Sequence, residues 1–338
     1  MAKKRKKKKV STLVGIVLCI FIIVAVGNVF ADFFGMSGKG EARIRVESGE
    51  TAGQIAEKLK ESGIISSKTL FQFSSKIGGW SAKFKTGMFV LDKGASYFEL
   101  CEKLSTAPVP EGSVWVTIPE GYELRQIADK LVESGIVDRE KFYDEVENGE
   151  FEYSFLSQIP KRENRLEGYL FPDTYLFSAN DSEHAVINAM LKRFDEKYSD
   201  EYKTKAEKLG MTFDEVITLA SIIEREALGD EDRRLVSSVF HNRLKSNEMP
   251  YLQSCATVQY ILKERKTVLS VSDTKIDSPY NTYINKGLPL GPIASPGEEA
   301  IYAALYPEKS DYLFFVLDST GKHRFAKTYN EHLKNQKK

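Results

Sequence analysis

Cysteine and histidine are both scarce in this chain, which contains three cysteines and four histidines among 338 residues. Cys19 lies in a hydrophobic run, while Cys101 and Cys255 are far apart. Their spacing matches neither a disulfide framework nor a metal-ligand cluster. The histidines are scattered and do not form the His-Glu-x-x-His pattern of zinc enzymes. We therefore expect no metal ion and no other cofactor.

Acidic residues are absent from the first 31 positions, where seven Lys or Arg at 3–9 precede 22 uncharged residues at 10–31. An apolar run of about 20 residues matches the thickness of a bilayer core, and a basic cluster favours the cytoplasmic side. We predict a cytoplasmic tail at 1–9 and a transmembrane helix at 10–31. The rest of this single-pass protein of the cell membrane would lie outside the cytoplasm. The alternative is a signal peptide cleaved after Ala31, but the run exceeds the usual length of a signal core.

The formal net charge of zero hides an asymmetry along the chain. All 48 Asp and Glu follow the hydrophobic run, but seven of the 48 Lys and Arg precede it, so the remainder carries a formal charge of −7. This balance is a poor match for nucleic-acid binding, which requires a basic surface. The exported length of about 300 residues is enough for two or more domains.

A repeat occupies two stretches, VESGETAGQIAEKLKESGII at 46–65 and IPEGYELRQIADKLVESGIV at 118–137. Each copy predicts a short strand, a turn at a glycine, and an amphipathic helix that ends at a second glycine. Another strand, turn and helix are expected between the copies, within FKTGMFVLDKGASYFELCEKL. The strand-turn-helix unit resembles LysM, a small module that binds glycans containing N-acetylglucosamine. The alternative is a repeated packing module without a ligand.

The second half of the chain predicts longer helices and one long loop. A helical region is expected at 213–246 with an interruption near Gly229, and Thr212 and Glu215 have the spacing of a capping box at its start. A loop rich in proline and glycine follows at 278–294, and an irregular loop of this length in a compact domain is usually functional. A strand, a turn and a return strand are expected near the C-terminus.

These patterns predict an α+β fold with one transmembrane helix. We expect a region of LysM-like small α/β modules at 41–107 and a second repeat or linking module at 108–150. A mixed α+β catalytic domain would occupy 151–336.

Two glutamates, Glu224 and Glu226, stand close together in TLASIIEREALGD at 218–230. On a helical wheel they fall on opposite flanks of the apolar face, and Arg225 falls on the far side, in solvent. Only one of them can therefore face a given cleft, and periodicity does not say which. The alternative for either is a solvated position that pairs with a nearby arginine.

Six motifs point to a function. They are LEGYLFPDTY, ASIIEREA, VFHNRL, LQSCATVQY, SPYNTY and GLPLGPI, in this order. Together they closely resemble the YceG/MltG family of endolytic murein lytic transglycosylases, and the resemblance extends over essentially the full chain. This family cleaves the β-1,4 bond between N-acetylmuramic acid and N-acetylglucosamine within peptidoglycan strands.

The resemblance implies that the second glutamate of the pair, Glu226, is catalytic. The other motifs are expected to line a glycan groove, with tyrosines stacking on sugars and amides binding acetamido groups. The candidate substrate-binding residues are Tyr169, Tyr280, Asn281, Tyr283, Gln253 and Asn242. Many lytic transglycosylases have Ser or Thr after the catalytic glutamate, but here Ala227 follows it. Cys255 and Ala256 replace a common Asp-Pro pair, and Leu290 replaces a common Pro.

One glutamate is enough for the implied reaction, because the C6 hydroxyl of the substrate can attack C1 in place of water. A hydrolytic muramidase would need a second carboxylate, for which Glu224 and Asp173 are the candidates. The other alternative is a non-catalytic peptidoglycan-binding scaffold. The resemblance also implies peptidoglycan strands as the substrate, and synthases of the elongation or division machinery as partners.

Overall fold

The computed structural model of the protein describes residues 31, 33–35, 39–106, 108–110, 112–227 and 229–336, without the side chains of residues 230 and 231. The chain divides into two compact units between Ser113 and Val114. The predicted basic tail and residues 10–30 of the predicted transmembrane helix lie outside the described residues. None of the helices in the described part combines the length and hydrophobicity that a membrane span needs.

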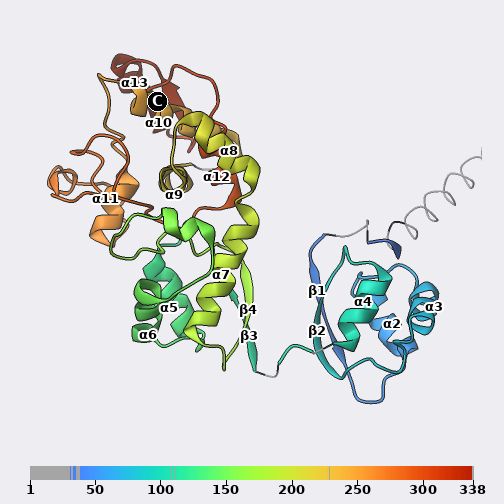
Figure 1. Cartoon of the computed structure of the whole chain (residues 1–338). Helices are drawn as coiled ribbons and strands as arrows, with labels where there is room; N and C mark the ends of the chain where they lie inside the picture. The colour runs from blue at the N-terminus through green and yellow to red at the C-terminus, as the bar shows by residue number, and fades with distance from the viewer. Residues whose placement is uncertain are drawn as a thin grey trace, which may run out of the picture. The chain divides into compact units, whose positions relative to one another are not determined.

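The first unit packs three helices against a two-stranded sheet (Figure 1). Its elements are β1 (Glu41–Val46), α2 (Ala52–Glu61), α3 (Lys68–Ile77), β2 (Gly87–Asp92) and α4 (Tyr97–Ser105). The strands are antiparallel, with a register that runs from Glu41 opposite Asp92 to Val46 opposite Gly87. Alternation along β1 turns Ile44 and Val46 inward. They meet the buried faces of the helices, so this unit has a hydrophobic core of its own.

The second unit is mainly helical and contains two further two-stranded sheets. Its elements, in chain order, are β3 (Ser113–Thr117), α5 (Leu124–Glu133), α6 (Arg139–Asn148), η1 (Ser154–Gln158), β4 (Thr174–Ser178), α7 (Glu183–Lys197), α8 (Asp200–Leu209), α9 (Phe213–Glu226), α10 (Asp230–Lys245), α11 (Cys255–Leu262), η2 (Asp273–Lys275), α12 (Glu298–Leu305), β5 (Phe314–Leu317), β6 (His323–Ala326) and α13 (Tyr329–Asn335). β3 pairs with β4, and β5 pairs with β6 in an antiparallel hairpin. The α+β prediction is confirmed.

Helix α9 lies at the centre of this unit, where α8, α10, α11 and α12 pack against it (Figure 1). Thr212 and Glu215 form the predicted capping box, in which each side chain accepts the backbone N–H of the other residue, at 2.7 and 3.2 Å. Nearly every position of α9 before Glu224 is buried. The helix ends at Glu226 because Ala227 takes an extended conformation. The next helix, α10, starts after Gly229, where the sequence predicts an interruption.

The two repeat copies have matching local structure but lie in different units. The turn glycines Gly49 and Gly121 have φ of +84° and +73°, a region that favours glycine. At the start of each helix, Gln54 or Gln126 accepts the N–H of the N-cap residue, at 2.9 and 3.0 Å. The second copy shares one core with the helices around α9. The domain boundaries predicted after residues 107 and 150 stay predictions.

Candidate active site

Glu226 is the last residue of α9, and its carboxylate lies at the N-terminus of α11. Oε1 accepts a hydrogen bond from the Ser254 hydroxyl at 2.5 Å and one from the Ala256 N–H at 3.3 Å. Ser254 is the N-cap residue of α11, so the carboxylate also faces the positive end of that helix dipole. The segment at 254–256, far from Glu226 in sequence, thus fixes one carboxylate oxygen. The other oxygen, Oε2, has no protein partner among the described residues.

A buried hydroxyl network holds Ser254 in place. Its N–H donates to Oγ1 of Thr282 at 3.0 Å, and Oγ1 of Thr257 donates to the Ser254 carbonyl at 2.8 Å. The two threonine hydroxyls are 2.9 Å apart. Because Thr282 belongs to the proline- and glycine-rich loop, this network ties that loop to α11 and to Glu226.

Glu224 and Arg225 are engaged in holding the helix. Glu224 accepts the N–H of Gly297 at 3.2 Å and lies 3.7 Å from the guanidinium of Arg233. The prediction that Arg225 faces solvent is wrong, because its side chain is only 2% exposed and donates to Glu123 at 3.1 Å. The second repeat copy covers this side of α9, which a helical wheel cannot reveal.

A cavity of about 830 Å³ opens beside Glu226. It brings together three of the predicted site residues, Glu226, Gln253 and Tyr283. The wall on the α9 side also includes Glu120, Glu224, Arg243 and Cys255, and the other wall is formed by the β5–β6 hairpin and α13. A cavity of this size between a carboxylate and a hairpin suits an extended ligand of several rings.

Gln253 and Tyr283 reach the cavity in different ways. Gln253 has a φ of +49°, which is uncommon outside glycine, and its N–H donates to the Thr282 carbonyl at 3.1 Å. Its exposed side chain makes no hydrogen bond within the described part of the chain. The Tyr283 hydroxyl lies 3.1 Å from Sγ of Cys255, and burial raises the pKa of both groups.

Arg243 is a buried cation in the same cavity wall. It donates to the carbonyls of Leu313 and Leu252 at 2.6 and 2.7 Å, and its guanidinium lies 5.3 Å from the centre of the Phe314 ring. Burial lowers its pKa to about 10. The side chain therefore joins the hairpin to the segment that precedes Ser254, with no carboxylate partner among the described residues.

Three of the predicted substrate-binding residues do not line this cavity and are hydrogen-bonded to other parts of the protein. Tyr169 is fully buried and its hydroxyl donates to Asp214 at 2.5 Å. Asn281 is fully buried and donates to the carbonyls of Thr274 and Ile276, while Asn242 donates to two carbonyls of the segment before β5. The Tyr169 hydroxyl and the donating amide groups of Asn281 and Asn242 already have protein partners, so we reassign all three to holding the fold.

Residues 44–338 match the model of the YceG-like family. The chain belongs to the YceG-like family. It is 35% identical over 311 residues to a Bacillus subtilis (strain 168) protein named endolytic murein transglycosylase, covering 89% of this chain and 85% of that protein.

Two further relatives agree with this family assignment. A Streptococcus pneumoniae (serotype 2, strain D39) protein of the same name is 32% identical over 325 residues, covering 88% of this chain and 58% of that protein. The crystal structure of a yceG-like protein from Listeria monocytogenes superposes with a TM-score of 0.59 at 34% identity, covering 88% of this chain and 99% of that one.

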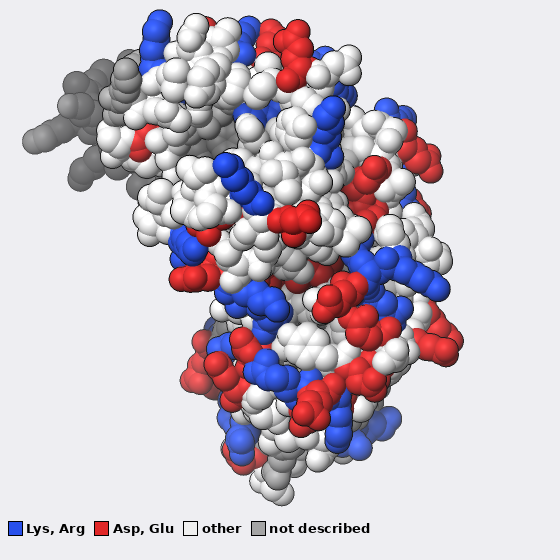
Figure 2. Space-filling model, turned by 90° about the vertical axis from the view of Figure 1, so that its left-hand side faces the viewer, with Lys and Arg blue, Asp and Glu red and all other residues white. Residues whose placement is uncertain are grey.

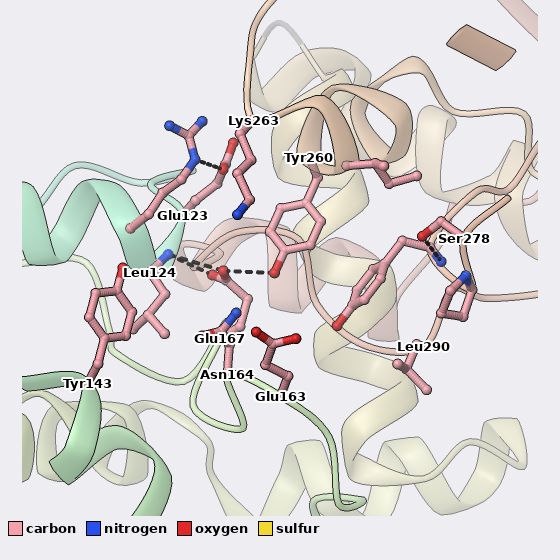
Figure 3. A pocket seen from close by; sticks show the side chains of 14 residues that line it. Glu123, Leu124, Tyr143, Glu163, Asn164, Glu167, Tyr260, Lys263, Ser278 and Leu290 are labelled. Carbon is pink, nitrogen blue, oxygen red and sulfur yellow. Dashed lines mark hydrogen bonds and ion pairs between the residues drawn. The ribbon is translucent and has the colours of Figure 1, made fainter. Parts of the chain in front are cut away.

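The remaining predicted residue of this YceG-like protein, Tyr280, lines a second cavity of about 550 Å³ (Figure 3). Its ring lies 5.0 Å from that of Tyr260, whose hydroxyl donates to Glu167 at 3.2 Å. Figure 3 shows Glu167 between Tyr260 and the backbone N–H of Leu124, which donates to both carboxylate oxygens at 2.9 and 3.1 Å. Burial raises the pKa of Glu167 to about 8. Burial thus favours the protonated form of Glu167, which caps α5 by accepting the Leu124 N–H.

Sequence reasoning missed Ser254, although it lies in a motif that was singled out. Ala227, which follows the glutamate, has no hydroxyl. The structure instead supplies one from Ser254 on another segment. The missed signal was a serine with N-cap spacing at the start of α11. Across the described residues, no group of three or more His, Cys, Asp and Glu side chains is placed to hold a metal ion.

Proposed function

We propose that the protein is a membrane-anchored endolytic enzyme that cuts the β-1,4 bond between N-acetylmuramic acid and N-acetylglucosamine within nascent peptidoglycan strands. It is a lytic transglycosylase, as its relatives named endolytic murein transglycosylase indicate. The observation that carries the residue assignment is the placement of Glu226. Its carboxylate has one oxygen fixed by Ser254 and Ala256 and lies on the wall of an 830 Å³ cavity.

In this mechanism Glu226 acts first as an acid and then as a base. It donates a proton to the glycosidic oxygen while the bond from that oxygen to C1 of N-acetylmuramic acid breaks. The resulting carboxylate then accepts the proton of the C6 hydroxyl as that oxygen bonds to C1. The products are a free 4-hydroxyl on the leaving sugar and a 1,6-anhydro end, with no water consumed.

The surroundings of Glu226 favour this reaction over hydrolysis. A glycosidase that activates water needs a second carboxylate across the bond. Glu224 is occupied by Gly297 and Arg233, and Asp173 pairs with Arg193 at 2.7 Å and does not line the cavity. Glu120, exposed at the cavity wall, is the carboxylate that a muramidase mechanism would have to use.

Two of the predicted residues remain as substrate contacts in this proposal. The exposed amide of Gln253 is suited to an acetamido group, and the ring of Tyr283 offers a face for a sugar. Figure 2 shows Lys and Arg interspersed with Asp and Glu over one face of the molecule, without a large field of one sign. This surface suits a glycan substrate better than nucleic acid.

The enzyme would be held in the cell membrane by residues 10–31, with its N-terminus in the cytoplasm. Anchoring confines the cavity to the zone where new strands emerge, so a cut there would release a strand from its synthase. Peptidoglycan synthases are accordingly the proposed partners. Protease treatment of intact cells without their wall should degrade everything after the anchor but leave the basic tail, and complete protection would refute this topology.

The test of the reaction is mass spectrometry of the products released from un-crosslinked nascent glycan. The chain from Asp32 onward would be compared with its Glu226→Gln variant, and Glu224→Gln would serve as the matched control two residues away. We expect anhydro ends, lighter by one water than hydrolysed ends, from the wild type and none from Glu226→Gln. Reducing ends that vanish in Glu120→Gln would instead identify a muramidase. Glycan retained without products by every protein would favour a non-catalytic scaffold.

A further inference from the structure

An aromatic surface lies on the first unit next to the end of the predicted anchor. Four rings touch in series, and we call them the aromatic cluster: Phe34, Phe33, Phe98 and Trp80. Their centroids are 5.0 Å apart from Phe34 to Phe33, 5.8 Å from Phe33 to Phe98 and 5.9 Å from Phe98 to Trp80. Phe34 is 54% exposed and Phe98 is 39% exposed. Large aromatic side chains gathered in one exposed patch mark a contact surface.

The cluster is fixed to the body of the first unit. The Phe33 ring also packs against that of Tyr97, which is fully buried, at 5.5 Å. Gly35 has a φ of +75°, and a Cβ there would lie 2.6 Å from the carbonyl oxygen of Gly94. The chain that follows the anchor is thus pressed against the start of α4, and only glycine allows this close approach.

This attachment sets where the cluster must be if the anchor spans the bilayer. Phe33 comes two residues after Ala31, the last residue of the uncharged run. Two residues of helix advance the chain by only about 3 Å. A helix that leaves the bilayer at Ala31 therefore brings Phe33 to its surface. The rings that Phe33 touches come with it.

The charge of the neighbouring segment matches an anionic surface. From Ser62 to Leu91 the chain contains four lysines and no acidic residue. This segment includes Trp80 and α3, which exposes Phe73 and Ile77, one helical turn apart, at 59% and 64%. Exposed aromatic and aliphatic side chains flanked by lysines are typical of protein surfaces that lie in the headgroup region of a bilayer.

We propose that the aromatic cluster and α3 form a membrane-contact surface, which rests in the headgroup region of a bilayer of anionic phospholipid beside the anchor. The proposal depends on the membrane anchor of the proposed function. The first unit is then held against the bilayer by two attachments, the anchor and this surface.

The two tryptophans of the chain allow a direct test. Trp80 lies in the cluster and Trp115 lies in β3 of the second unit. The full-length chain would be reconstituted into phosphatidylglycerol vesicles whose acyl chains carry bromine near the headgroup, a quencher of tryptophan fluorescence. The Trp115→Phe variant reports on Trp80 alone, and Trp80→Phe reports on Trp115 alone as the matched control.

We expect the emission of Trp80 to be shifted to the blue and mostly lost in these vesicles, with the emission of Trp115, which lies outside the proposed surface, measured as the reference. A chain that floats with the vesicles but keeps its Trp80 emission would refute the contact surface and leave the anchor intact. A chain that does not float would refute both.

A second experiment measures the Trp80 emission while the lipid headgroup is changed or soluble peptidoglycan fragments are added. Replacing phosphatidylglycerol by brominated phosphatidylcholine should reduce the quenching of Trp80, as should the Lys76→Gln, Lys83→Gln and Lys85→Gln triple variant. If soluble peptidoglycan fragments restore the emission in the vesicles, Trp80 is a sugar contact of the LysM-like unit. That result would overturn the proposal.

Discussion

Replacement of Glu167 by glutamine should remove a large pH dependence from the stability of the second unit. Burial raises the pKa of this carboxyl from 4.5 to about 8. The folded unit therefore keeps a proton that the unfolded chain loses above pH 4.5, and its stability falls as the pH rises from 4.5 to 8. At 1.36 kcal/mol per pH unit, the loss between pH 5 and 7.5 is about 3 kcal/mol.

Glutamine has the shape of the neutral acid. Its carbonyl oxygen can accept from Leu124, and its amide can donate to the Tyr260 hydroxyl, which in this structure donates to Glu167. Stability would be measured by urea unfolding of the chain from Asp32 onward, in a Trp80→Phe background where Trp115 reports on the second unit alone. Between pH 5 and 7.5 the wild type should lose about 3 kcal/mol more than Glu167→Gln. The control is Glu163→Gln, an exposed residue of the same cavity wall, which should behave as the wild type. Parallel curves for Glu167→Gln and wild type would show that Glu167 is ionised in the fold.

Further predictions concern the site and its supports. Ser254→Ala removes the hydroxyl donor to Glu226, so kcat/KM should fall about 10-fold, the value of one hydrogen bond of ordinary strength, while the circular dichroism spectrum stays unchanged. Asn281→Ala removes two donated hydrogen bonds from a buried loop and should lower stability by about 2–3 kcal/mol in urea unfolding; unchanged stability with a raised KM would restore it as a glycan contact. Gln253→Gly relieves the positive φ and should stabilise the protein by about 1 kcal/mol, whereas glycan binding measured by calorimetry should weaken.

Much of the local structure could be predicted from the sequence. The capping box at Thr212, the turn glycines of the two repeats and the hairpin at the C-terminus each depend on residues within a few positions of one another. Such signals are local, because a cap or a turn is satisfied by its own neighbours. The start of α9 and the interruption near Gly229 follow from the same kind of signal.

The roles of individual polar residues could not be predicted in this way. Tyr169 and Asn281 belong to residue types that bind sugars and also tie loops together, and the choice depends on burial by segments far away in sequence. Periodicity placed Glu224 and Glu226 on two flanks of one helix. Both glutamates line the cavity, so the prediction that only one could face a given cleft is wrong. Only the tertiary partners Gly297 and Ser254 show that Glu224 is engaged in holding the helix, while Glu226 keeps one carboxylate oxygen available.

The repeat shows that equivalent positions of one local structure can make different contacts. The two N-cap positions are equivalent, but the first copy has Thr51 and the second has Glu123. Thr51 only closes its own helix, with its hydroxyl accepting the N–H of Gln54. Glu123 is buried and accepts from Arg225 and Arg125 at 3.1 and 2.6 Å. Because Arg225 directly precedes Glu226, the second copy holds the end of α9 in place. The cap residue Glu123 thus links the second copy to the residue beside the proposed catalytic glutamate.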